Sequence, residues 1–371
     1  MDACSASPNS TPTITLATTV PTRLSSTAIA PTRNVTPTST FETQVAAPTS
    51  ETNATPIPSA TATLRPEPTA TALNPLTIPA LRARDFPGSD LVIEQTLTPG
   101  ANYQRYIASH LSDGLKIYGL LTVPNSEKPA TGWPVILFNH GYISPSEYRT
   151  TERYVAYQDA LARAGYITFK SDYRGHGNSE GTPSGHFAPG YTIDVLNAMG
   201  SLKKFADADP NRIGMWGHSL GGEIVLRAMV ISPDIKAGVS WAGTVAPPSE
   251  QLGMWGGGSG GGANVPHSAP RAPSDLTQQY GTPEENPEFW ASLASTSYLG
   301  ELSGPLQLHH GTADPEVPLG FSQVLYDEIL KAGKTAELYT YPGGNHNLSA
   351  NFNTAMQRTL AFFDKYVKGL P

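Results

Sequence analysis

The feature that most constrains the fold is the segment Gly217-His218-Ser219-Leu220-Gly221, because of what lies on either side of it. The short apolar run Ile213–Trp216 precedes this segment, and a stretch with helical spacing, Gly222–Val230, follows it. A serine flanked by glycines at such a junction predicts a sharp bend between a strand and a helix, where larger residues would clash. The bend would present the Ser219 hydroxyl at the positive end of the helix.

Strand-like and helix-like segments alternate through the rest of the chain. Segments rich in β-branched and aromatic residues, separated by turn signals, predict early antiparallel strands at Leu91–Leu97, Tyr103–His110 and Leu115–Val123. Short apolar runs predict strands buried on both faces at Pro134–Asn139, Tyr166–Lys170, Ile213–Trp216, Gly238–Trp241 and Leu306–His309. Helices are expected between them, at Glu152–Ala164, Thr192–Phe205 and Gly222–Val230. The alternation predicts an α/β fold with a mainly parallel central sheet and helices on both faces.

A break in composition near residue 80 divides the chain. About two-thirds of residues 1–80 are Thr, Pro, Ala or Ser, and Phe41 is their only aromatic residue. Such a segment has too little apolar surface to offset the entropy of ordering it, so we expect a disordered, extended tether. Residues 81–371 hold nearly all the aromatic side chains and are long enough for one enzyme-sized domain.

Charge and cysteine content exclude several classes of protein. A net charge of −7 argues against a nucleic-acid-binding protein, and no apolar run approaches the roughly 20 residues that cross a bilayer. Cys4 is the only cysteine, so no disulfide can form within the chain. Its place after Ala3 and before the tether resembles the start of a mature bacterial lipoprotein, although Asp2 and the missing leader depart from that pattern. We therefore expect an exported protein, tethered to the cell surface through a lipid on Cys4 or extracellular.

A serine nucleophile needs a base, and elimination among the nine histidines leaves His346. It follows the strand-like Ala336–Tyr341 in a flexible loop before the last helical segment, and it comes after both the serine and an acid. The other histidines are expected in strands, in turns or in the irregular segment: His110, His140, His176, His186, His218, His267, His309 and His310.

The acid and the oxyanion donors are expected at the ends of other strands. Asp314 follows the strand Leu306–His309, at the carboxyl edge where catalytic groups of open α/β sheets collect, and Glu316 is the rival two residues later. The backbone N–H groups of Leu220 and Tyr142 are the expected donors to a developing oxyanion, because one follows the serine and the other lies just after a strand.

These motifs resemble the α/β-hydrolase superfamily, and more narrowly the catalytic domain of the prolyl oligopeptidase family and its dienelactone-hydrolase-like and esterase relatives. The likeness spans about Leu91 to Leu370 and rests on five segments: Asn139–Tyr142, Asp172–Gly181, Gly217–Gly222, His310–Asp314 and His346. The resemblance implies an α/β-hydrolase fold with Ser219 as nucleophile, Asp314 as acid and His346 as base. Peptidases of that family carry a β-propeller where this chain has its tether, which favours acyl hydrolysis without recognition of peptide ends.

We therefore expect a serine hydrolase that acts on a small ester or a short peptide. Carboxylic-ester hydrolysis is favoured, a serine peptidase is the main alternative, and a non-catalytic surface binding protein is a third. No cofactor or metal is expected, because the chain lacks H-E-x-x-H and phosphate-loop patterns. Residues 250–288 contain the glycine-rich run Gly256–Gly262 and are a candidate lid. The expected lining of the substrate pocket is Tyr142, Trp241, Trp255 and Trp290.

Overall fold

A computed structural model describes residues 73–184, 187–255 and 274–370, without the side chains of residues 254, 255, 274 and 275. All of these residues belong to the unit Thr69–Pro371. The predicted tether up to residue 72, Cys4 and the run Gly256–Gly262 lie outside the described residues.

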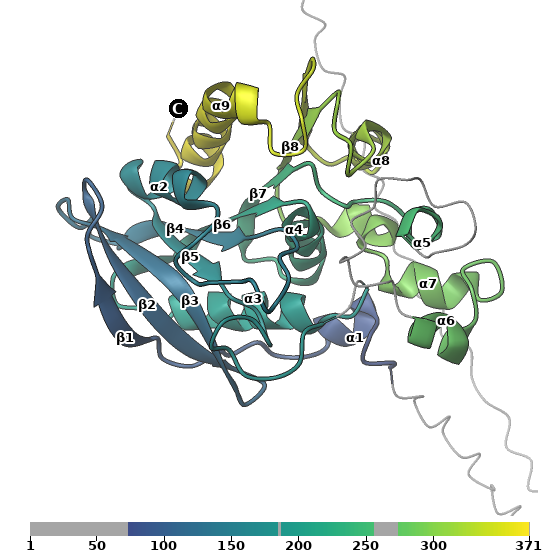
Figure 1. Cartoon of the computed structure of the whole chain (residues 1–371), viewed down its shortest axis with the longest axis horizontal. Helices are drawn as coiled ribbons and strands as arrows, with labels where there is room; N and C mark the ends of the chain where they lie inside the picture. The colour runs from purple at the N-terminus through teal and green to yellow at the C-terminus, as the bar shows by residue number, and fades with distance from the viewer. Residues whose placement is uncertain (1–72, 185–186, 256–273, 371) are drawn as a thin grey trace, which may run out of the picture. The chain divides into compact units, whose positions relative to one another are not determined.

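One nine-stranded sheet runs through the described region, in the order β1-β2-β3-β5-β4-β6-β7-β8-β9 (Figure 1). Its first three strands and the β3–β5 pair are antiparallel, and the remaining pairs are parallel. The strands are β1 Val92–Leu97, β2 Tyr103–Ser112, β3 Leu115–Pro124, β4 Trp133–Asn139, β5 Ile167–Ser171, β6 Ala208–His218, β7 Ile235–Trp241, β8 Leu306–Gly311 and β9 Ala336–Tyr341. This arrangement confirms the predicted fold class.

Helices cover both faces of the sheet, because alternate residues of a buried strand point to opposite sides. Val135 and Leu137 of β4 join a core cluster with α1, α3, α4 and α8, whereas Ile136 and Phe138 join a second cluster with α2 and α9 (Figure 1). These helices are α1 Ile78–Arg82, α2 Val155–Arg163, α3 Gly190–Leu202, α4 Leu220–Ile231, α8 Leu319–Lys331 and α9 Phe352–Phe363.

The folded region begins earlier than the composition predicts. Helix α1 starts at Ile78, with Thr77 as its N-cap, and the side chains of Ile78 and Leu81 are almost completely buried in the first core cluster. The predicted boundary at residue 80 is therefore wrong by several residues, because two apolar side chains on one helical face suffice to anchor this end.

The segment 250–288 is more ordered than a passive loop where the structure describes it. It contains most of α5 Pro248–Trp255 and all of α6 Ser274–Tyr280, and α7 Pro287–Leu293 follows, with a 3₁₀ helix at Ser295–Glu301. Figure 1 shows α5, α6 and α7 gathered on one side of the domain, away from β1 to β3. They have a small core of their own, formed by Phe187, Leu276, Trp290 and Leu293. In the described parts of the chain, no helix combines the length and apolar character needed to span a bilayer.

Candidate active site

Ser219 occupies the predicted bend between β6 and α4. Its backbone is in an unusual left-handed conformation, with φ 55° and ψ −120°. The Ser219 N–H donates to the carbonyl of Trp241 at 2.9 Å, and its own carbonyl accepts from the N–H of Thr244 at 3.2 Å. Such strain persists only where the surroundings enforce it, which is typical of functional sites.

The glycines around Ser219 are required by close backbone contacts. A Cβ on Gly221 would lie 2.0 Å from the carbonyl oxygen of Asn139, and one on Gly217 would lie 2.1 Å from that of Gly221. Real Cβ atoms do not approach so closely, so no larger residue fits either position. The first turn of α4 therefore approaches the end of β4 because Gly221 lacks a side chain, and the end of β6 because Gly217 lacks one.

His346 lies in the loop after β9 and is buried. Its Nδ1 donates to Oδ2 of Asp314 at 2.8 Å, and its ring centroid lies 4.5 Å from that of His218, the residue before Ser219. No hydrogen bond joins Ser219 Oγ to the His346 ring within the described residues. Catalytic hydrogen bonds are often long before substrate binds, so this gap is compatible with a serine–histidine pair.

Asp314 is held by four N–H donors. Its Oδ1 accepts from the backbone of Glu316 and Val317, at 2.8 and 3.0 Å, and its Oδ2 accepts from His346 at 2.8 Å. Nε2 of His310 is 3.2 Å from Oδ2 and shares its proton between this oxygen and the Val317 carbonyl, which lies at 3.0 Å. Burial opposes ionisation of this carboxyl, but the hydrogen bonds from His310 and His346 outweigh burial and hold its pKa well below the usual value. A permanent carboxylate on Nδ1 keeps the proton there and leaves Nε2 as the basic nitrogen.

The rival acid lies on the other side of the ring. Glu316 has a half-exposed side chain, and its Oε2 is 3.8 Å from Nε2 of His346. It therefore does not contact the nitrogen that an orienting acid must hold. The geometry favours Asp314 over Glu316.

The loop after β4 lies against the serine. A Cβ on Gly141 would lie 3.1 Å from Cβ of Ser219, which is tighter than almost all real contacts. The Gly141 N–H donates to the hydroxyl of Tyr154 at 3.0 Å, so it is not available to a substrate. Leu220 opens α4, where an N–H has no partner within the helix. The assignment of Tyr142 and Leu220 as oxyanion donors stays a prediction.

Two residues that contact the predicted triad, His310 and His218, were not predicted to do so. His310 donates to Asp314 and accepts from Ser322 Oγ at 2.7 Å through Nδ1. His218 lies within hydrogen-bond distance of Tyr154 Oη at 2.7 Å and of the His346 carbonyl at 3.0 Å. The sequence carries a signal for His310 alone, because it lies four residues before the acid.

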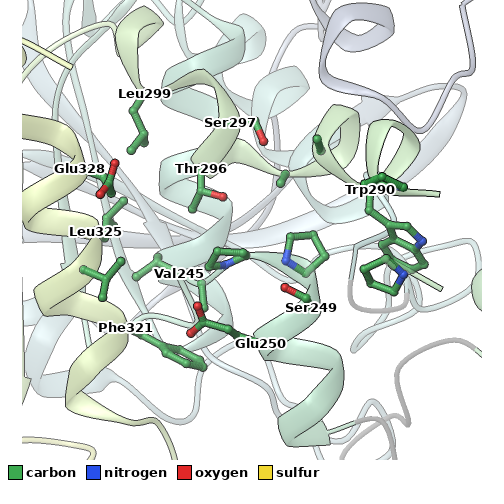
Figure 2. Close-up of a pocket in the computed structure, with 18 of the residues that line it drawn as sticks. Val245, Ser249, Glu250, Trp290, Thr296, Ser297, Leu299, Phe321, Leu325 and Glu328 are labelled. Atoms are coloured by element: carbon green, nitrogen blue, oxygen red, sulfur yellow. The ribbon is translucent and has the colours of Figure 1, made fainter. Parts of the chain in front are cut away.

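A cavity of about 610 Å³ lies between the loop after β7, helices α5 and α7, the 3₁₀ helix and α8. Figure 2 shows Trp290 on one side of it, with Leu299 and Leu325 opposite. Ser219, Asp314 and His346 do not line this cavity. Its wall begins at Val245, next to Thr244, whose N–H contacts the Ser219 carbonyl.

The predicted tryptophans divide between cavity and core. Trp290 lines the cavity, and its role in lining a substrate pocket stays a prediction. Trp241 is completely buried in the second core cluster, where its Nε1 donates to Thr359 at 3.1 Å, so the prediction that it lines a pocket is wrong. The side chain of Trp255 lies outside the described residues. Among the described residues, no group of three or more His, Cys, Asp or Glu side chains is arranged to hold a metal.

Comparison with known proteins gives consistent matches. The model of the prolyl oligopeptidase family matches residues 153–370. The chain is 23% identical over 269 residues to the uncharacterized peptidase YtmA of Bacillus subtilis, covering 71% of this chain and 94% of that protein. It is 26% identical over 251 residues to human dipeptidyl peptidase 8, covering 63% of this chain but only 25% of that protein. Among solved structures, an acetyl xylan esterase from Paenibacillus superposes with a TM-score of 0.58 at 17% identity, covering 77% of this chain and 92% of the other.

Proposed function

Because the chain belongs to the prolyl oligopeptidase family and is a serine hydrolase, we propose that it cleaves carboxylic esters through an acyl-enzyme on Ser219. The observation that carries the proposal is the hydrogen bond from His346 Nδ1 to the buried carboxylate of Asp314, on a ring that packs against the residue preceding Ser219. That bond leaves Nε2 free to take a proton.

The proposed reaction has two halves. Nε2 of His346 removes the Ser219 proton while Oγ attacks the carbonyl carbon of the ester, and the C=O becomes a tetrahedral oxyanion. The N–H groups of Leu220 and Tyr142 are the proposed donors to that oxygen. The oxyanion then collapses, the C–O bond to the alcohol breaks, and Nε2 returns the proton to the alcohol. Water repeats the sequence on the acyl-enzyme and releases the acid.

The preference for esters rests on the cavity. Its lining is mainly apolar, with Trp290, Phe321 and Leu325 among the large side chains, and such a surface suits the apolar part of an ester. A peptidase is the alternative, favoured by the carboxylates of Glu250 and Glu284 in the same lining. Among the described lining residues there is no Lys or Arg, so these carboxylates could hold the ammonium group of a peptide.

The first experiment tests the nucleophile. A fluorophosphonate probe should label the wild-type protein and fail to label Ser219→Ala, whose kcat should fall by about 10⁶-fold, as in comparable triads. A Ser219→Ala variant that is labelled at the wild-type rate would refute the assignment. Absence of labelling in both proteins would instead favour a binding protein.

The second experiment separates esterase from peptidase. We expect kcat/KM for p-nitrophenyl esters to exceed that for aminoacyl-p-nitroanilides, and Trp290→Ala to change the preference among acyl chain lengths. Faster cleavage of the anilides, with a loss on Glu250→Gln or Glu284→Gln, would support the peptidase alternative.

We also propose that the protein is exported and held at the cell surface by a lipid on Cys4. The support is the sequence alone: a single cysteine ahead of a Thr, Pro, Ala and Ser-rich segment. Metabolic labelling with a palmitate analogue in the native cell should mark the protein, and Cys4→Ser should abolish the label. Equal labelling of the variant would rule out this anchor.

A further inference from the structure

Four residues from different parts of the chain form one series of hydrogen bonds beside Ser219. The Gly141 N–H lies 3.0 Å from Tyr154 Oη, which lies 2.7 Å from Nδ1 of His218. Nε2 of His218 lies 3.0 Å from the backbone carbonyl of His346. The series therefore starts in the loop after β4 and ends in the loop that carries the proposed base.

The direction of each bond follows from the groups at the two ends. The His346 carbonyl can only accept, so Nε2 of His218 carries its proton. The ring is completely buried, and burial lowers the pKa of His218 to about 3, so near neutral pH it holds one proton and Nδ1 accepts. Tyr154 must then donate to Nδ1, and its oxygen is left to accept the Gly141 N–H. Every donor in the series has one acceptor.

The chain bends unfavourably to bring Tyr154 into place. Arg153 and Tyr154 both have left-handed backbones, with φ 56° and 53°, immediately before α2. Residues other than glycine rarely adopt this backbone conformation, and two such residues in succession are held only by strong surrounding contacts. The hydroxyl of Tyr154 makes two such contacts.

We infer that Tyr154 and His218 are positioning residues, which fix the oxyanion loop and the base loop relative to each other and to Ser219. This inference rests on the proposed function. Gly141 is so close to Ser219 that a Cβ on it would lie 3.1 Å from Cβ of Ser219, and the tilted His346 and His218 rings have centroids 4.5 Å apart. A shift along the series should therefore move a reacting group. Displacements near 1 Å are enough to slow an enzyme about 100-fold.

The test is the Tyr154→Phe variant, which removes one oxygen atom and keeps the ring. After normalisation to the fraction of active sites, kcat for a p-nitrophenyl ester should fall about 10- to 100-fold with KM within about twofold. The affinity for an aryl boronic acid, which mimics the tetrahedral state, should fall in parallel. If Tyr154 had a merely structural role, the variant would have a lower melting temperature or a smaller active fraction. Its kcat per active site and its affinity for the boronic acid would then be unchanged.

Two substitutions of His218 test its two hydrogen bonds separately. A glutamine amide can reach the position of Nε2, so His218→Gln keeps the bond to the His346 carbonyl, whereas His218→Asn keeps the acceptor for Tyr154. Each should retain more activity than His218→Ala. The losses from Tyr154→Phe and His218→Ala should be less than multiplicative when combined, because both break the same bond.

The matched control is Tyr166→Phe, which loses a tyrosine hydrogen bond of 2.8 Å to Asp364 at the opposite end of the sheet. It should leave kcat and boronate affinity unchanged. Unchanged kcat and boronate affinity in Tyr154→Phe would overturn the inference. Measured in parallel, an active Ser219→Ala would instead overturn the proposed function, so the two failures are distinguishable.

Discussion

Replacing Asp314 by asparagine tests the proposed acid with almost no change in shape. The carboxylate accepts two rigid backbone N–H groups on Oδ1 and two imidazole N–H groups on Oδ2. The asparagine amide can accept hydrogen bonds only through its oxygen, because its other side is an NH₂ donor. Because the backbone cannot turn its N–H groups away, we expect the amide oxygen to stay with them and the amide nitrogen to face the imidazoles.

That arrangement forces His346 into the wrong tautomer. Facing an NH₂ group, Nδ1 must become an acceptor, and the proton moves to Nε2, the atom that should take the proton of Ser219. The expected loss of kcat is about 10⁴-fold, as in a comparable triad, or about 5 kcal/mol of transition-state stabilisation. Nε2 of His310 keeps the Val317 carbonyl as its acceptor at 3.0 Å, so the free energy of unfolding should fall by no more than about 1 kcal/mol.

The assay is hydrolysis of a p-nitrophenyl ester at pH 7.5, with thermal unfolding measured on the same samples. Glu316→Gln is the matched comparison, because its side chain is half exposed and does not contact Nδ1. We expect its kcat/KM to stay within about threefold of wild type. A mild effect of Asp314→Asn together with a severe effect of Glu316→Gln would refute the reasoning, since the acid would then be misassigned by two residues.

Three further predictions concern stability. Gly221→Ala should prevent folding or abolish activity, because its Cβ would lie 2.0 Å from a backbone oxygen, whereas Gly320→Ala, with nothing within 4 Å, should be tolerated in a melting experiment. Removing residues 1–83 should lower the melting temperature by more than about 5 °C, because α1 is lost, whereas removing residues 1–72 should leave it unchanged. Equal melting temperatures of the two truncated proteins would contradict this prediction. Acid should destabilise the protein, because histidines that burial keeps neutral in the folded state bind protons in the unfolded chain below about pH 6.5. His110, His218 and His309 should each remove about 2 kcal/mol of unfolding free energy at pH 5. Burial lowers these pKa values to about 4 for His110 and about 3 for His218 and His309, and unfolding in urea at pH 5 and 7 measures the loss.

The strands could be predicted, and the candidate triad residues could be singled out, because both depend on local patterns. Ser219 and Asp314 follow apolar runs and His346 follows a strand-like segment, and the carboxyl ends of parallel strands share one edge of a sheet. Chain order alone then distinguishes Asp314 from acids elsewhere. Helix α1 escaped prediction because Ile78 falls at the end of a long polar segment, and the predicted boundary at residue 80 separates it from Leu81.

The positioning series could not be predicted, because it depends on where rings point. Tyr154 belongs to a segment that reads as ordinary helix, and the left-handed backbone that turns its hydroxyl toward His218 has no signature in a tyrosine. The prediction that Trp241 lines a pocket was wrong for a related reason. It ends β7, and apolar runs buried on both faces do not reveal which face their last residue takes.

The way α1 is attached bears on how the domain would respond to a pulling force. The described chain enters through α1, which is held by two buried side chains and by a hydrogen bond of 2.7 Å from Arg82 Nε to the Val230 carbonyl. Val230 lies in α4, the helix that starts directly after Ser219. Tension applied to the N-terminus would therefore be borne first by a five-residue helix, which could detach while the nine strands keep their pairing. Once α1 has detached, the load passes along the backbone to Gly88 and Ser89, whose N–H groups donate to Asn197 and Ser201 of α3, so these two hydrogen bonds would yield next, before the edge strand β1.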